Sequence, residues 1–176
     1  MKVIDNFLDK ETFKSIKDLM LNNSFDWYYS NSITSEHLDR KEFQFIHIFY
    51  QYGEARNSYS IIQPIVKKIN PFCLVRVKAN LLTITPKIKE YDFHVDFKNK
   101  QNLTTAILYI NTCDGYTIFK DGTKVESVEN RFIEFDSNLE HTGSSCTDEN
   151  VRAVINLNYF KWLKNLNLAI HHGILN

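Results

Sequence analysis

Residues 103–136 read LTTAILYINTCDGYTIFKDGTKVESVENRFIEFD. Four short runs rich in Val, Ile, Tyr and Phe alternate in this stretch with turn residues, and they occupy 103–110, 116–119, 124–128 and 131–135. Asp114-Gly115 and Asp121-Gly122 flank the run 116–119, and Asp-Gly is typical of two-residue hairpin turns. The pattern predicts antiparallel strands joined by tight turns.

The same alternation continues on both sides of this stretch. Similar runs occupy 73–84 (CLVRVKANLLTI), 91–97 (YDFHVDF) and 151–160 (VRAVINLNYF). Seven short strands with tight turns indicate an antiparallel sandwich or barrel. We therefore predict a mainly β, α+β protein whose β core spans residues 73–160.

Residues 1–72 have a mixed pattern that includes helices. Val3-Ile4 predicts a short strand, and Asp9 is a typical N-cap residue for the helix that follows it. The apolar side chains of that helix are spaced for one face: Phe13, Ile16, Leu19 and Met20. The run 43–52 predicts a strand, and 61–69 has helical spacing that requires Pro64 to lie near the first turn.

No linker or repeat divides the chain, so we predict one domain over residues 1–176. Its parts would be a mixed, helix-containing flank (1–72), the β core (73–160) and a tail (161–176) that forms a short closing helix. The chain has 21 Lys and Arg residues together and 21 Asp and Glu residues together, so its formal net charge is zero. Without a positive net charge, nucleic acid is not an expected partner.

The sequence also favours a cytoplasmic protein with no membrane contact. No apolar run approaches the ~18 residues of a membrane-spanning helix. The amino terminus lacks the apolar core of a signal peptide, and the three cysteines are widely spaced without a CxxC motif.

The stretch Phe93-His94-Val95-Asp96-Phe97 is the first chemical feature. In a strand, His94 and Asp96 point to the same face, roughly 7 Å apart at the backbone, and can converge on one metal ion. Imperfect alternation would let Asp92 replace Asp96. Alone, such a pair is more typical of a solvated strand face.

His141 is the second feature, because it follows the strand 131–135 and a polar loop. A distant histidine that joins His94 and Asp96 would complete a face of two histidines and one carboxylate. This face suits Fe(II), since it fills three of six octahedral positions and leaves three open. The alternative is a hydrogen-bonded structural histidine.

Arg152 is the third feature, within the alternating strand 151–160. Alternation places Arg152, Val154, Asn156 and Asn158 on one face and apolar side chains on the other. A guanidinium that lines a barrel needs an anionic partner, because burying it unpaired costs several kcal/mol. A dicarboxylate ligand would supply this partner, and so would an acidic side chain at the mouth of the barrel.

Together, HxD, a distal histidine and the following arginine resemble the 2-oxoglutarate- and Fe(II)-dependent oxygenases, and most of all their prolyl-4-hydroxylase-like branch. VIDNFLDKETF (3–13) is similar to the segment that leads into the first helix of that branch. The strand 106–111 and the stretch 115–136 resemble the family segments between the two histidines. The sequence is also similar to oxygenases encoded by marine bacteriophages, which would place the protein in the host cytoplasm.

The resemblance implies a double-stranded β-helix, the jelly-roll or cupin-like core, flanked by amino-terminal helices. It implies that His94, Asp96 and His141 hold Fe(II), and that Tyr109 and Arg152 anchor the far carboxylate of 2-oxoglutarate. With O2, such an enzyme hydroxylates a C–H bond and releases succinate and CO2. The substrate would be a small molecule or a peptide.

The sequence departs from some relatives at Asn158. Nucleic-acid demethylases carry a second arginine there, and many prolyl hydroxylases carry tryptophan. Asn156 and Asn158 either line the substrate end or fill the barrel with polar groups. Two rival functions remain: a cupin-like metalloprotein that does not use 2-oxoglutarate, and a non-catalytic jelly-roll binding module. The predicted carboxylate clamp of Arg152 and Tyr109 argues against the cupin alternative.

Overall fold

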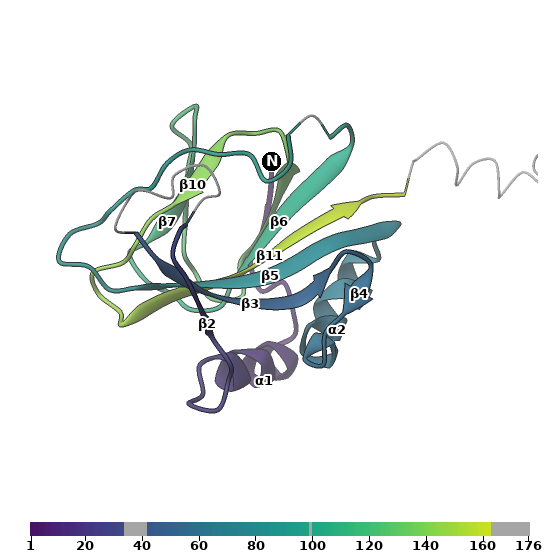
Figure 1. Ribbon diagram of the computed structural model, residues 1–176, viewed down its shortest axis with the longest axis horizontal. Coiled ribbons are helices and arrows are strands. Elements are labelled where there is room, and N and C mark those ends of the chain that lie inside the picture. The colour runs from purple at the N-terminus through teal and green to yellow at the C-terminus, as the bar shows by residue number, and fades with distance from the viewer. Residues whose placement is uncertain (34–41, 99, 163–176) are drawn as a thin grey trace, which may run out of the picture.

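The computed structural model describes residues 1–33, 42–98 and 100–162 (Figure 1). The order of elements in these residues is β1 (Lys2–Ile4), α1 (Lys10–Met20), β2 (Tyr28–Ser30), β3 (Gln44–Gln51), β4 (Glu54–Ala55), α2 (Tyr59–Ile69), β5 (Cys73–Thr83), β6 (Leu103–Tyr109), β7 (Tyr116–Phe119), β8 (Lys124–Glu126), β9 (Phe132–Asp136), β10 (His141–Gly143) and β11 (Val151–Phe160). The protein is therefore mainly β with two helices, as predicted.

The described strands form two antiparallel sheets. The large sheet has the order β1-β9-β6-β11-β5-β3-β2, with β4 paired to β3, and the small sheet has the order β10-β7-β8. Strands from the first 72 residues therefore extend the same sheet as β5 and β11. This two-sheet arrangement confirms the predicted antiparallel sandwich.

The two faces of the large sheet bury different clusters. One face packs against α1 and α2, which lie together on one side of the sheet (Figure 1). The other face packs against the small sheet. The side chains of this second cluster are Ile107, Tyr109, Phe119, Val125, Ile133, Phe135 and Val154.

Alternation along β11 divides its side chains between these faces, as the sequence predicts. Ala153, Ile155 and Leu157 join the cluster beneath the helices. Arg152, Val154 and Asn156 line a cavity on the opposite side of the sheet. The strand thus positions one row of side chains for packing and the other for a site.

Local structure accounts for the start of α1 and for the end of α2. The Asp9 carboxylate accepts a hydrogen bond of 2.9 Å from the backbone N–H of Thr12, which confirms the predicted N-cap of α1. Helix α2 ends at Asn70, whose φ of +49° is left-handed. Two predictions need correction: Leu19 lies on the exposed side of α1, and Pro64 lies in the second turn of α2.

The turn signals were only partly right. Asp121-Gly122 closes the β7–β8 hairpin, where Gly122 adopts a φ of +88°. Asp114-Gly115 does not close a hairpin, because β6 and β7 belong to different sheets. The predicted strand over 91–97 is also wrong: this segment forms an isolated bridge between His94 and His141 and one further backbone hydrogen bond, from the N–H of Tyr91 to the carbonyl of Gly143.

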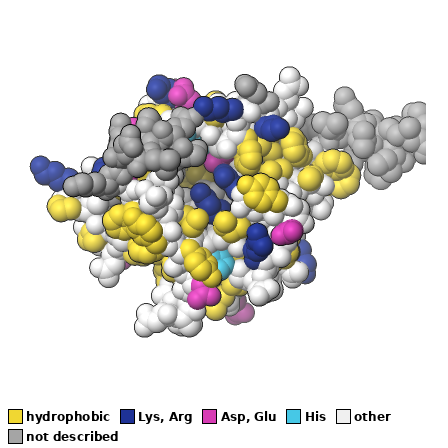
Figure 2. All heavy atoms as spheres, viewed as in Figure 1, with side chains coloured by type: hydrophobic (Ala, Val, Ile, Leu, Met, Phe, Trp, Pro, Cys, Tyr) yellow, Lys and Arg dark blue, Asp and Glu magenta, His cyan; other side chains and the backbone are white. Residues whose placement is uncertain are grey.

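The predicted closing helix lies mostly outside the described residues, which end at residue 162. Neither of the two described helices is long and apolar enough to cross a membrane. Basic, acidic and hydrophobic side chains are interspersed over the face of the molecule in Figure 2.

Candidate metal centre and its cavity

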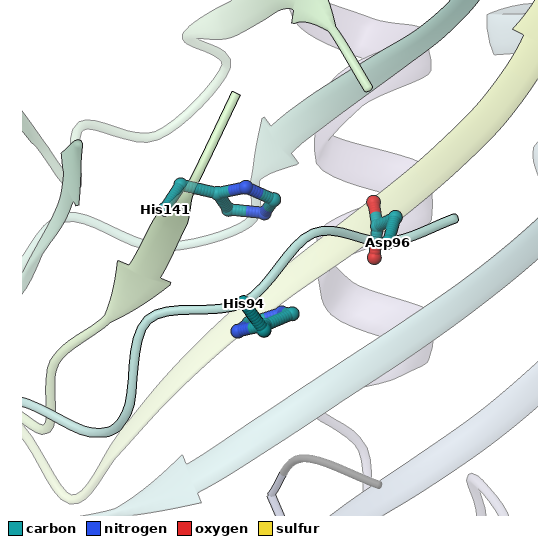
Figure 3. Close-up of side chains that lie close together, drawn as sticks. All are labelled: His94, Asp96 and His141. Carbon is teal, nitrogen blue, oxygen red and sulfur yellow. The ribbon is translucent and has the colours of Figure 1, made fainter. Parts of the chain in front are cut away.

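Three side chains from two distant segments meet between the sheets. The ligand atoms of His94, Asp96 and His141 all lie within 4.8 Å of one another. His141 lies on β10, whereas His94 and Asp96 lie on the irregular segment before β6 (Figure 3). The structure thus groups Asp96, and not Asp92, with the two histidines among the described residues.

A backbone bridge aligns the two imidazoles. The N–H of His94 donates to the carbonyl of His141, and the N–H of His141 donates back, both at 3.0 Å. Directly opposed residues of an antiparallel pair place their side chains near each other. The ring centroids accordingly lie 4.9 Å apart.

Hydrogen bonds fix which nitrogen of each ring faces the site. Nδ1 of His141 lies 3.0 Å from the carbonyl oxygen of Leu139, and Nδ1 of His94 lies 3.3 Å from that of Asp92. A carbonyl only accepts, so each neutral ring carries its proton on Nδ1. Both Nε2 lone pairs remain for a metal ion, and burial, followed by repulsion from His141, lowers the pKa of His94.

Asp96 is held by three donors. The Arg76 guanidinium donates to Oδ1 at 2.8 Å, and Asn158 and Thr105 donate to Oδ2 at 2.9 and 3.0 Å. Arg76 also donates to the Asn158 amide oxygen at 3.0 Å, which closes the network. The carboxylate orientation is therefore set from β5, β6 and β11 together.

This network keeps Asp96 ionised. Burial alone would raise the pKa of Asp96, but the Arg76 charge, the nearby His141 and the Asn158 hydrogen bond more than offset it and bring the pKa to about 2. Asp96 therefore offers a negatively charged carboxylate beside the two imidazoles at neutral pH.

This donor set fits a divalent metal ion. Ligand atoms about 2.1 Å from one ion lie about 3 to 4 Å apart, so small side-chain rotations close the arrangement. A carboxylate has about four lone-pair directions, so Asp96 can keep its hydrogen bonds and still bind a metal. Non-haem Fe(II) is typically bound by two imidazoles and one carboxylate, with its other coordination positions open.

Arg152 opens on the same cavity as the three ligands. Its side chain is buried, with 3% exposure, and one terminal N–H donates to Thr117 Oγ1 at 3.2 Å. Its Nε has no hydrogen-bond partner, and no described carboxylate forms an ion pair with it. The predicted alternative, a salt bridge to an acidic side chain, is therefore absent from the described residues.

Two glycines make room for this guanidinium. A Cβ on Gly115 would lie 2.6 Å from Cδ of Arg152 and 2.7 Å from the carbonyl oxygen of Ser145. A Cβ on Gly143 would lie 3.1 Å from a terminal nitrogen of Arg152. Gly115 thus has a packing role where the sequence suggested a hairpin turn.

Tyr109 lies behind Thr117. It is fully buried, and its hydroxyl donates to Thr117 Oγ1 at 2.9 Å. The Arg152 guanidinium lies 5.5 Å from the centroid of its ring. Thr117, and not Tyr109, belongs to the cavity lining, so Tyr109 contacts the site through Thr117 and Arg152.

Sequence reasoning missed several residues of this site. Arg76 and Thr105 hold Asp96, Thr117 holds Arg152, and Lys78 lines the cavity. Arg76 and Lys78 alternate with buried Val77 and Ala79 along β5. That alternation indicated that Arg76 and Lys78 share one face of β5. Only the strand register shows which side chains they meet on that face.

Replacing Arg76 by methionine is expected to lower the free energy of unfolding of the metal-free protein by about 3 kcal/mol at pH 7, since it leaves a buried carboxylate without its cation. The pKa of Asp96 is lower in the folded protein than in the unfolded chain, where it lies near 4. The ionised carboxylate therefore stabilises the fold above pH 4, and this contribution is lost as pH falls towards 2. Urea unfolding at pH 7 and pH 3 should show a smaller pH dependence in the variant.

Arg56→Met is the matched control, because the Arg56–Glu54 pair is exposed and contributes little. An Arg76→Met protein as stable as wild type, with an unchanged pH dependence, would show that the network does not hold Asp96.

Comparison with known proteins places this geometry on a known fold. No protein family matches the sequence, and no curated protein matches it. Similar solved structures include a prolyl hydroxylase from Trichoplax adhaerens in complex with a hypoxia inducible factor peptide fragment. It is 16% identical, with a TM-score of 0.61, over 91% of this chain and 83% of that one.

Two further structures have similar scores. A 2OG-Fe(II) oxygenase family oxidoreductase from Burkholderia pseudomallei is 10% identical, with a TM-score of 0.63, over 90% of this chain and 84% of that one. The epimerase SnoN in complex with Fe3+, alpha ketoglutarate and nogalamycin RO is 10% identical, with a TM-score of 0.61, over 90% and 78%. These likenesses confirm the jelly-roll fold and the predicted resemblance at the level of the fold.

Proposed function

We propose that this chain is a single Fe(II)- and 2-oxoglutarate-dependent oxygenase domain, most similar to the prolyl-4-hydroxylase-like branch, that hydroxylates a C–H bond of its substrate. The observation that carries the proposal is the buried, incompletely paired guanidinium of Arg152 on the same cavity as a two-histidine, one-carboxylate group. A metal site alone does not require a buried guanidinium nearby. A keto-diacid that chelates the metal does, because its far carboxylate needs a cationic partner.

His94, Asp96 and His141 are the proposed metal ligands. Both histidines would bind through Nε2, because Nδ1 of each is engaged with a backbone carbonyl. Arg76, Asn158 and Thr105 orient Asp96 and hold its charge in place. When bound, iron with 2-oxoglutarate supplies the activation of O2 that hydroxylates the substrate and yields succinate and CO2.

Arg152 is the proposed anchor for the far carboxylate of 2-oxoglutarate. Its unpaired Nε and its fork of N–H donors match a planar carboxylate. The Thr117 hydroxyl lies beside this fork, and Tyr109 supports both groups from behind. Ile107, Val154 and Leu82 add apolar walls to the cavity, which limit the access of water.

The test is the visible charge-transfer band of the protein with Fe(II) and 2-oxoglutarate under anaerobic conditions. We expect a band in the wild type, no band in His94→Ala, and a band in Arg152→Ala only at much higher 2-oxoglutarate concentrations. Release of succinate on addition of O2 would then allow substrates to be screened by stimulated turnover.

The contrary outcomes lead to the rival functions. Iron binding without the band would support a cupin-like metalloprotein that does not use 2-oxoglutarate. Failure to bind any divalent metal would support a non-catalytic binding module.

A further inference from the structure

Lys78 is a second cation in the cavity, and the proposed reaction does not use it. Its side chain lines the cavity together with the three metal-ligand candidates, and it forms no hydrogen bond or ion pair within residues 1–33, 42–98 and 100–162. Burial, followed by repulsion from Arg76, lowers the pKa of Lys78 to about 8, although Asp96 opposes this.

Strand register separates Lys78 from Arg152. Arg152 lies opposite Leu82, whereas Lys78 lies opposite Asn156, four residues away along the paired strands. At about 3.3 Å per residue this offset is about 13 Å along the sheet. The carboxyl carbons of an extended five-carbon diacid are only roughly 5 Å apart, so one diacid would meet both cations only if the two side chains pointed towards each other.

The charge balance of the cavity points the same way. The positive charge of Arg76 is neutralised by the negative charge of Asp96 in their ion pair. Arg152 and Lys78 then remain as two cations without an anionic partner among the described residues. A divalent metal and a doubly charged 2-oxoglutarate neutralise each other and leave this surplus unchanged. A cavity with co-substrate bound would thus still attract an anion.

Asn80 supplies a second recognition group, two residues from Lys78 on the same face of β5. Its Nδ2 donates to Gln44 Oε1 at 2.7 Å, and its Oδ1 is buried without a partner. Gln44 Nε2 donates to the carbonyls of Ser32 and Ile33, so Gln44 must present its oxygen to Asn80. The orientation of Asn80 is therefore fixed: the residue lines the cavity, and its Oδ1 is a buried acceptor without a partner.

We propose, on the basis of the oxygenase function above, that the substrate is a small amino-acid derivative or hydroxy acid whose carboxylate binds Lys78 and whose N–H or O–H donates to Asn80 Oδ1. Such a ligand would pair the surplus cation and the unsatisfied acceptor at once. The substrate carboxylate would accept a charge-assisted hydrogen bond from Lys78. This binding position is distinct from the one at Arg152, which the 2-oxoglutarate carboxylate would take.

The experiment follows the Lys78 side chain by NMR in protein labelled with [13C]lysine, and the Lys78→Met variant assigns its signal. The protein is loaded with Zn(II), which is redox-inert, and then with 2-oxoglutarate. Three probes are added in separate titrations: N-acetylglycine, the neutral N-acetylglycinamide, and butyrate, which has a carboxylate but no donor.

N-acetylglycine is expected to shift the Lys78 signal saturably, with at least tenfold higher affinity than N-acetylglycinamide and about threefold higher than butyrate. Asn80→Leu should remove the preference over butyrate while keeping the preference over the amide. The signal of Lys67 in the last turn of α2 is the internal control and should not move.

The contrary result separates two sources of the anion. If 2-oxoglutarate itself moves the Lys78 signal and N-acetylglycine then has no effect, Lys78 binds the near carboxylate of the co-substrate and the proposal is wrong. Calorimetry with 2-oxoglutarate tests the oxygenase function independently. If that binding fails, the titration of the Zn(II) protein alone still decides whether Lys78 and Asn80 recognise the acid.

Discussion

The Asp96→Asn variant is expected to bind Mn(II) about 100-fold more weakly than the wild type, which corresponds to about 3 kcal/mol. The substitution preserves the shape of the side chain but removes the only carboxylate of the three-residue group. A neutral amide attracts a dication far less than a carboxylate does. Calorimetric titration of the metal-free protein measures this change, and Mn(II) avoids turnover during the titration.

Asp92→Asn is the matched control, since it makes the same chemical change four residues away in the same segment. Asp92 contributes its backbone carbonyl to His94 but is not part of the metal-binding group. We expect less than a threefold change in Mn(II) affinity. Equal losses in both variants would mean that the charge of the segment matters and that Asp96 is not the specific ligand.

Unfolding measurements must accompany this comparison, because Arg76 loses an ionised partner in Asp96→Asn. The amide oxygen can still accept one hydrogen bond, so the variant should remain folded at pH 7. A variant that is folded and still binds Mn(II) as the wild type does would refute the assignment of Asp96 as a ligand.

Strand alternation made much of the fold and site predictable. It places Arg152 on the cavity face of β11 and Ala153 on the helix face, as the structure has them. Side-chain period is a local property, so it can be read from a few neighbouring residues. The grouping of His94 with His141 rested on family resemblance, because no local pattern relates two residues 47 positions apart.

The remainder of the site depends on register, which sequence alone does not give. Arg76 meets Asp96 because β5 pairs with β11 at Asn158, and this pairing brings Arg76 and Asn158 side by side. A shift of β5 by one residue would turn Arg76 to the opposite face of the sheet from Asn158. The segment 91–97 has strand-like composition but lacks a continuous partner, so composition misjudged it.

The Arg152→Met variant is expected to bind 2-oxoglutarate at least about 100-fold more weakly in the presence of Mn(II), while its Mn(II) affinity changes less than threefold. The variant lacks the fork of N–H donors that matches a carboxylate, but it keeps all three metal-ligand candidates. Arg152→Lys should lose about tenfold, because an ammonium retains the charge without the planar fork. Calorimetry with each ligand in turn measures both affinities.

The same substitution should act on stability with the opposite sign. A buried guanidinium with an unpaired Nε destabilises the ligand-free fold, so Arg152→Met should raise the free energy of unfolding by about 1 to 2 kcal/mol. At 100 times its dissociation constant, 2-oxoglutarate stabilises the wild type by about 2.7 kcal/mol, and at that concentration it should barely affect the variant.

A guanidinium kept only for packing or structure would give the reverse pattern, in which Arg152→Met weakens the fold and leaves 2-oxoglutarate binding intact. Stability and affinity that change in opposite directions would instead show that the arginine is retained for a ligand, at a cost to the ligand-free protein. This pair of measurements therefore distinguishes a co-substrate anchor from a structural arginine without any knowledge of the substrate.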